Sequence, residues 1–130
     1  MSENFNIEII SPDKTIVKKS ATLVTIPSFE GNMGILKDHI SLITFLRPGL
    51  INIESDEKKE TFFIEEGVVE FFNNNLLILT ASAINIQDLD KNKVEDLILL
   101  AEKKITKNHI KDKEKYILSH KIDTLKEIRQ

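Results

Sequence analysis

The first half of the chain consists of short segments in which apolar and polar residues alternate. Phe5, Ile7 and Ile9, for example, fall on one face of an extended segment. Gly, Pro and Asn residues separate the segments and favour turns between them. Many short strands at this spacing indicate a sandwich or barrel rather than a parallel sheet. The predicted strands are 5–9, 15–17, 21–26, 50–54, 61–64, 68–72 and 76–79.

Two turns have a specific expected geometry. Asn73–Asn75 separates two predicted strands, and asparagine tolerates the positive φ that a tight hairpin needs. Pro48-Gly49 fits a type II turn, in which proline fixes its own φ and glycine takes a positive φ.

The second half changes to a helical period and contains neither glycine nor proline after Gly67. Asp88 and Asp90 precede the first apolar stripe and are candidate N-caps. A polar break, 106–109, separates the two stripes. The first stripe contains Val94, Leu97, Ile98, Ala101 and Ile105, and the second contains Ile110, Ile117, Leu118, Ile122, Leu125 and Ile128.

These patterns predict an α+β fold with two parts. Residues 1–86 form an N-terminal antiparallel β-sandwich, and residues 87–130 form a C-terminal antiparallel two-helix hairpin. Neither helix is long enough to be stable alone in water. The hairpin therefore depends on what it packs against, which makes it a candidate for a movable element.

Charge and composition narrow the range of partners. The net charge is -3, with an acidic first part and a mildly basic end. This distribution lacks the dense basic patch of a nucleic-acid binder. The longest apolar stretch, Leu76–Ile86, is too short to cross a bilayer, so no direct lipid insertion is expected. The absence of cysteine fits a reducing compartment, and no homo-oligomer is expected.

The sequence offers no constellation for catalysis. No phosphate-binding loop and no nucleophile elbow are present. The three histidines, His39, His109 and His120, are too scattered in sequence to suggest a zinc site. We therefore expect no enzyme activity, no metal and no cofactor. The lysine-rich end has two main interpretations, a solvated helix surface or a docking site for an acidic protein; RNA or membrane binding is a third.

The segment 26–49 carries the most specific pattern. It contains Glu30-Gly31 and Gly34-Ile35, then His39, an Ile-Thr pair and a Pro-Gly turn, in that order. This ordered set resembles the signature region of the epsilon-subunit family of bacterial F-type ATP synthases. The segments 63–74 and 87–90 resemble the family's next strand pair and its junction into the helices. The resemblance covers nearly the whole chain.

The resemblance implies a non-catalytic rotor subunit in the central stalk, which couples the proton gradient to ATP synthesis. One side of the sandwich would bind the gamma subunit, and one end would rest on the ring of membrane-embedded rotor subunits. Glu30, Gly31, Asn32, Met33 and His39 match the ring-contacting positions. Asn32 replaces an acidic residue that some relatives carry. The complex would lie at the cytoplasmic face of the bacterial inner membrane, with this chain as a peripheral component.

The hairpin would be the regulatory element, packed on the sandwich or extended toward the catalytic hexamer to inhibit ATP hydrolysis. Lys103, Lys104 and Lys107 would then contact the catalytic subunits. Some family members bind ATP at the hairpin. The matching residues are Leu89, Asp90 and Lys93, where lysine replaces an arginine and lacks its planar fork, so ATP binding is not expected. The alternative interpretation is a small β-sandwich adaptor unrelated to ATP synthesis.

Overall fold

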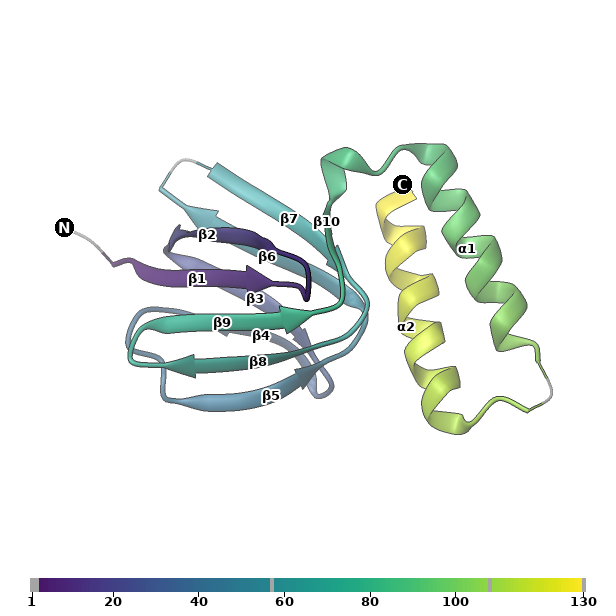
Figure 1. Cartoon of the computed structure of the whole chain (residues 1–130), viewed down its shortest axis with the longest axis horizontal. Coiled ribbons are helices and arrows are strands. Elements are labelled where there is room, and N and C mark those ends of the chain that lie inside the picture. The colour runs from purple at the N-terminus through teal and green to yellow at the C-terminus, as the bar shows by residue number, and fades with distance from the viewer. Residues whose placement is uncertain (1–2, 57, 108, 130) are drawn as a thin grey trace.

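The computed structural model describes residues 3–56, 58–107 and 109–129. In this part of the chain, ten strands are followed by a short 3₁₀ turn and two helices (Figure 1). The strands are β1 (Phe5–Ile10), β2 (Thr15–Ala21), β3 (Leu23–Ser28), β4 (Gly31–Ile35), β5 (Leu42–Leu46), β6 (Gly49–Ser55), β7 (Lys58–Ile64), β8 (Gly67–Phe72), β9 (Asn75–Thr80) and β10 (Ala83–Asn85). The helical elements are η1 (Ile86–Asp88), α1 (Lys91–Ile105) and α2 (Asp112–Arg129).

The strands form one sheet that folds over itself into a sandwich. Their order is β10-β7-β6-β3-β5-β8-β9-β1-β2, and β4 pairs with β3 beside this path. A salt bridge between Lys19 of β2 and Glu60 of β7 connects strands from near the two ends of this order. The predicted α+β class, a sandwich followed by two helices, is therefore confirmed. One pairing departs from the antiparallel prediction, because β1 and β9 run parallel.

The core lies between the inward faces of the strands. Phe5 and Phe71 pack edge to face with ring centroids 5.8 Å apart, a favourable aromatic geometry. Both side chains are almost completely buried. The alternation predicted for the first strand is confirmed, since Phe5, Ile7 and Ile9 all point inward. The other fully buried large side chains include Ile26, Ile35, Leu46, Ile51, Ile53, Ile64, Leu76 and Ile78.

The sequence prediction missed three strands. β4 contains two glycines and an asparagine, and β10 has only three residues, so neither shows a clear strand pattern. β5 lies in the segment that was interpreted mainly as a loop signature. The predicted strand 21–26 corresponds to β3, which begins at Leu23, whereas Ala21 is the last residue of β2.

The two turn predictions have different outcomes. Asn73 and Asn74 connect β8 to β9 with φ values of 52° and 59°, as predicted for a tight hairpin. Gly49, in contrast, does not have a positive φ, so the prediction for its backbone is wrong. Gly49 is required for another reason: a Cβ atom there would lie 2.6 Å from the Cβ atom of Pro27. The close approach of β6 to β3 therefore excludes a larger residue.

The two helices form the predicted hairpin, and α2 lies between the sandwich and α1 (Figure 1). The predicted stripe on α1 is confirmed at Val94, Ile98 and Ala101, which are buried. α2 begins at Asp112, so Ile110 precedes the helix. The predicted break between the helices includes Asn108, which lies outside the described residues.

A second, smaller apolar cluster joins the hairpin to the sandwich. Its buried members come from both parts of the chain: Phe63 of β7, Leu89, Val94 and Ile98 around α1, and Leu125 of α2. It is separate from the main core of the sandwich. The hairpin therefore has its own limited contact with the sandwich and is not part of the main core.

Candidate protein-docking surfaces

Strands β5, β8 and β9 carry apolar side chains on their outer face as well as their inner face. Ile43, Phe45 and Phe72 are 71%, 61% and 65% exposed. The strand register places Phe45 beside Val68, and Val68 beside Leu79. Together with nearby outward-facing residues, they form a surface that is interrupted by Glu70 and that we call the apolar face: Ile43, Phe45, Val68, Phe72, Leu77 and Leu79.

Large exposed apolar surfaces on a folded domain mark contact sites for other molecules. Among the outward-facing residues of these three strands, Glu70 is the charged one, and it pairs with Ile43 and Leu77 in the register. A strand that covers a core on one side and faces water on the other usually alternates apolar and polar residues. Here the outward positions are apolar except for Glu70 and Asn75, a pattern closer to that of strands covered on both sides. The apolar face is therefore suited to binding another protein.

The sequence analysis did not identify this surface, although a signal was present. Leu76-Leu77-Ile78-Leu79 is a continuous apolar run, and Val68-Val69 and Phe71-Phe72 are apolar pairs. Continuous runs in strands indicate burial on both faces. The run therefore indicates a second, outward apolar face on β9 as well as the strand itself.

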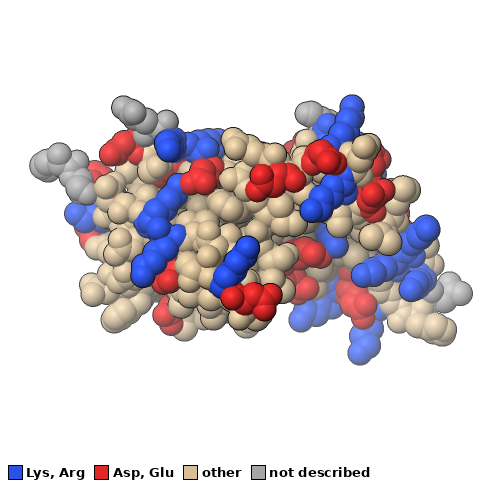
Figure 2. All heavy atoms as spheres, turned by 45° about the horizontal axis from the view of Figure 1, so that its top comes forward, with Lys and Arg blue, Asp and Glu red and all other residues tan. Residues whose placement is uncertain are grey.

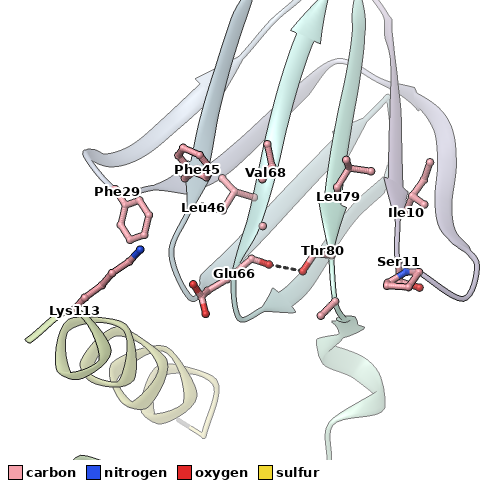
Figure 3. A pocket seen from close by; sticks show the side chains of 13 residues that line it. Ile10, Ser11, Phe29, Phe45, Leu46, Glu66, Val68, Leu79, Thr80 and Lys113 are labelled. Atoms are coloured by element: carbon pink, nitrogen blue, oxygen red, sulfur yellow. Dashed lines mark hydrogen bonds between the residues drawn. The ribbon is translucent and has the colours of Figure 1, made fainter. Parts of the chain in front are cut away.

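A groove of about 790 Å³ extends from the apolar face toward the beginning of α2 (Figure 3). Its walls are mainly apolar and include Phe45, Val68 and Leu79. Lys113 of α2 and Glu66 of the β7–β8 turn also line it. The hydroxyl of Thr80 donates to the backbone oxygen of Glu66 and holds this turn. A partner on the apolar face could therefore reach α2 through this groove.

A second exposed surface lies at the end of the sandwich that points away from the helices. The β8–β9 turn is at this end (Figure 1). Asp38 and Asn74 exchange two hydrogen bonds, of 2.7 and 3.0 Å, which join the β4–β5 loop to that turn. The His39 ring packs edge to face against Phe71, and Ile40 is 79% exposed. We call this loop and turn, residues 36–41 and 73–74, the far tip.

The structure does not bring the five predicted ring-contacting residues together. Glu30 follows Phe29, whose backbone oxygen accepts a hydrogen bond from the hydroxyl of Tyr116 in α2, so this turn lies beside the helices. Gly31, Asn32 and Met33 belong to β4 and pair with β3, so the predicted loop 30–33 is mostly a strand. His39 lies at the far tip. The expectation of one shared end is therefore wrong, because β4 separates the two groups along its length.

The three lysines predicted to contact the catalytic subunits lie at the end of α1 and just after it. Lys103 and Lys104 are in the last turn of the helix, where positive charge interacts favourably with the helix dipole. Lys107 follows the C-cap residue, Thr106. All three are exposed. Figure 2 shows basic and acidic side chains interspersed over the helical end, so on that face the hairpin does not present a uniformly basic patch.

The residues that match the family's ATP motif have structural roles here. Leu89 is buried in the second apolar cluster. The Asp90 carboxylate accepts a hydrogen bond of 2.8 Å from the backbone N–H of Lys93 and is the N-cap of α1. The Lys93 side chain is exposed. The N-cap prediction is thus confirmed for Asp90, whereas Asp88 lies in η1.

Replacing Asp90 with alanine is expected to lower the stability of the hairpin by about 1 kcal/mol, because the N-cap hydrogen bond is lost. Urea denaturation followed by helical circular dichroism measures this change. Asp88→Ala is the matched control and should change stability by less than about 0.5 kcal/mol. Equal losses in both variants would contradict the assigned cap.

Polar contacts near the middle of α2 join it to the sandwich in addition to the second apolar cluster. The Arg47 guanidinium donates to ring nitrogen Nδ1 of His120 at 2.5 Å. Lys121 forms a salt bridge of 2.6 Å with Glu65. Burial and the Arg47 charge lower the pKa of His120, and the nearby Asp123 carboxylate opposes this shift.

Within residues 3–56, 58–107 and 109–129, no three His, Asp or Glu side chains are grouped to hold a metal ion. No helix in the same ranges is both long and apolar enough to span a membrane. Within the described ranges, the candidate sites are thus the protein-docking surfaces set out above.

Comparison with known proteins defines the family. Residues 4–86 match the model of the beta-sandwich domain of the ATP synthase delta/epsilon chain. The chain is 50% identical over 127 residues to the ATP synthase epsilon chain of Pelagibacter ubique (strain HTCC1062), covering 97% of this chain and 98% of the relative. It is 32% identical over 130 residues to that of Parvibaculum lavamentivorans, covering 99% and 98%. The chain belongs to the ATP synthase epsilon-chain family.

The fold is also found in solved structures. A chain of the Euglena gracilis mitochondrial ATP synthase, solved with OSCP, F1 and the c-ring, matches with a TM-score of 0.81 at 20% identity, covering 100% of this chain and 84% of that one. A chain of the Tetrahymena thermophila central stalk and c-ring structure matches with a TM-score of 0.63 at 15% identity, covering 96% of each. The resemblance carried by residues 26–49 is thus confirmed, and an unrelated adaptor is not favoured.

Proposed function

We propose that this chain is a non-catalytic subunit of the rotor of an F-type ATP synthase. Its role is to couple the proton gradient to ATP synthesis by joining other rotor proteins. The observation that carries the proposal is 50% identity to an epsilon chain over nearly the whole length. The physical support is a folded domain with a large exposed apolar surface, as expected for a protein that works by binding others.

The apolar face is the proposed binding surface for the gamma subunit. Phe45 and Phe72 are large aromatic side chains, the type that most often dominates binding energy at protein interfaces. The residues of this face are different from those of the second apolar cluster, so a partner can cover the face without replacing the contacts of that cluster. The groove at its end, next to Lys113, would also give that partner access to α2.

The far tip is the proposed contact with the ring of membrane-embedded subunits. His39 and the exposed Ile40 lie there, and the Asp38–Asn74 hydrogen bonds hold the loop in one conformation. A loop that is fixed before binding loses less conformational entropy in the complex. Residues 30–33 form a second, separate candidate contact beside the hairpin. This assignment places the chain at the cytoplasmic face of the bacterial inner membrane, held there through the complex.

Residues 87–130 are the proposed regulatory element. The hairpin packs on residues 1–86 through a small apolar cluster and a few polar contacts, so release requires breaking a limited interface. The released hairpin would extend toward the catalytic hexamer and inhibit ATP hydrolysis. Two such arrangements must differ by only a few kcal/mol for a ligand or a gradient to choose between them.

Replacing Lys103, Lys104 and Lys107 with glutamate is expected to relieve inhibition of ATP hydrolysis without loss of assembly. Reversing three charges adds repulsion where an acidic partner surface would have been attracted. Steady-state hydrolysis by the purified complex measures the effect, and subunit composition checks assembly. Lys91→Glu with Lys93→Glu, at the other end of α1, is the control and should leave inhibition in place. Unchanged inhibition in the triple variant would contradict the assigned contact.

A further inference from the structure

One of the contacts between α2 and the sandwich involves a titratable ring, that of His120. Arg47 is held in place by the sandwich, because its Nε donates to the backbone oxygen of Ser28 at 2.9 Å and its backbone N–H donates to Pro27. Its Nη1 then reaches His120 on α2, at 2.5 Å from Nδ1 and 3.2 Å from Nε2. A guanidinium can only donate hydrogen bonds. His120 must therefore present an unprotonated nitrogen to accept this bond.

We propose that the Arg47–His120 pair is a pH-sensitive latch: the hairpin docks on the sandwich when His120 is neutral and is released when His120 gains a proton. Protonation removes the acceptor and places two positive groups within hydrogen-bond distance. Histidine is the side chain whose ordinary titration range makes such a change near neutral pH. The latch acts on the chain itself and needs no partner.

The groups around His120 do not supply a carboxylate that would cancel this repulsion at the latch. On the sandwich side, Arg47 faces the ring, while Glu65 of the β7–β8 turn is paired with Lys121 at 2.6 Å. On α2 itself, the ring packs edge to face with Tyr116 at 4.5 Å. Asp123 favours the protonated ring, but its effect is smaller than those of burial and Arg47. Glu127, near the far end of α2, lines the same small cavity as Arg47, His120 and Asp123.

The direction of the pH effect follows from the pKa of His120. Docking lowers this pKa, through burial first and the Arg47 charge second. The released hairpin has an ordinary histidine, with a pKa of about 6.5. The contribution to docking is therefore fully present above about pH 6.5. It decreases as the pH falls below that value, because the released state then binds protons more readily than the docked state.

The effect has an upper limit that sets the scale of the experiment. At pH 5.5, one unit below the ordinary pKa, the protonated form of a free histidine is about ten times as abundant as the neutral form. The ratio of released to docked hairpin can therefore rise by at most about tenfold relative to pH 7.5. The limit is reached only if the docked His120 stays neutral at pH 5.5.

Because the chain contains no cysteine, one engineered thiol can report on release. Thr124 lies on α2, is buried against the sandwich and is close to cysteine in size. In Thr124→Cys, the rate of modification by a thiol reagent is proportional to the released fraction. The same variant with His120→Gln is the reference, since glutamine can accept from Arg47 but does not titrate. The ratio of the two rates removes the intrinsic pH dependence of the thiol.

From pH 7.5 to pH 5.5, this ratio is expected to rise between about twofold and tenfold. His109→Gln, which removes a histidine from the same hairpin, should leave the rise intact. A ratio that stays constant would overturn the proposal, and so would a rise that His109→Gln abolishes.

A second measurement needs no engineered cysteine and decides the matter if Thr124→Cys undocks the hairpin. The titration of the His120 ring is followed by NMR in the full chain and in Arg47→Gln. The midpoint is expected to move to higher pH in the variant, because the repelling charge is gone. An unchanged midpoint would overturn the latch. Both tests use the isolated chain, so their outcome is independent of the proposed role in ATP synthase; only the consequence for hydrolysis depends on it.

Discussion

Replacing Phe71 with alanine is expected to lower the free energy of unfolding of the sandwich by about 3–5 kcal/mol. Phe71 is among the largest fully buried side chains and contacts the rings of both Phe5 and His39. Its removal leaves a cavity that the surrounding strands can fill only in part. Since a domain of this size is stable by about 5–15 kcal/mol, this loss is a large fraction of the total. Urea denaturation measures it.

Phe72→Ala is the matched control, because Phe72 is the next residue in β8 but points outward. Its loss of stability should be below about 1 kcal/mol. A similar loss in both variants would mean that the inward and outward faces of β8 are assigned incorrectly. Phe72→Ala should instead weaken binding to the gamma subunit, which separates a role in folding from a role in docking.

Replacing Phe45 with aspartate is expected to weaken binding of the chain to the gamma subunit by at least about 30-fold, or about 2 kcal/mol. The substitution places a charge on the apolar face, beside Val68, where the interface would exclude water. Phe45 is 61% exposed in the free chain, so stability should change by less than about 1 kcal/mol. Titration of purified gamma subunit with the variant measures the affinity.

Leu99→Asp is the control for this substitution. Leu99 is also an exposed apolar residue, but it lies on α1, away from the apolar face. Its variant should bind the gamma subunit as tightly as the unmodified chain. Equal loss in both variants would indicate a general effect of charge, and full binding by Phe45→Asp would contradict the assigned surface.

The elements with a strong period were predictable from the sequence. Alternation placed Phe5, Ile7 and Ile9 inward, and the helical stripe placed Val94 and Ile98 against the sandwich. In each case one local pattern determines which side of the element is buried. Asp90 was predictable as an N-cap for a similar reason, since the carboxylate and the N–H that it accepts from are only three residues apart.

Features that depend on contacts between residues far apart in the sequence were not predictable from a local pattern. β4 is a strand because β3 pairs with it, despite its two glycines. The parallel pairing of β1 with β9 joins segments about seventy residues apart. Position 49 is a second example. A glycine is required there because Pro27 on β3 leaves no room for a Cβ atom, and not because of the conformation of the local turn.

The candidate site was predicted only in part for the same reason. The ordered residues of 26–49 identified the family, but the sequence order grouped Glu30 with His39. The β3–β4 hairpin places the first beside the helices and the second at the far tip. The apolar face and the Arg47–His120 contact each combine residues from separate segments. Their recognition required the register of the strands and the position of α2.

The central claim is that this chain works by binding other rotor proteins and catalyses no reaction itself. It is tested most directly by extracting the membrane ATPase from cells that carry an affinity-tagged copy of the chain and identifying what purifies with it. The account predicts the gamma subunit and the ring subunits in constant ratio to the chain, and their loss in Phe45→Asp. Recovery of the tagged chain without any stalk or ring subunit would contradict it.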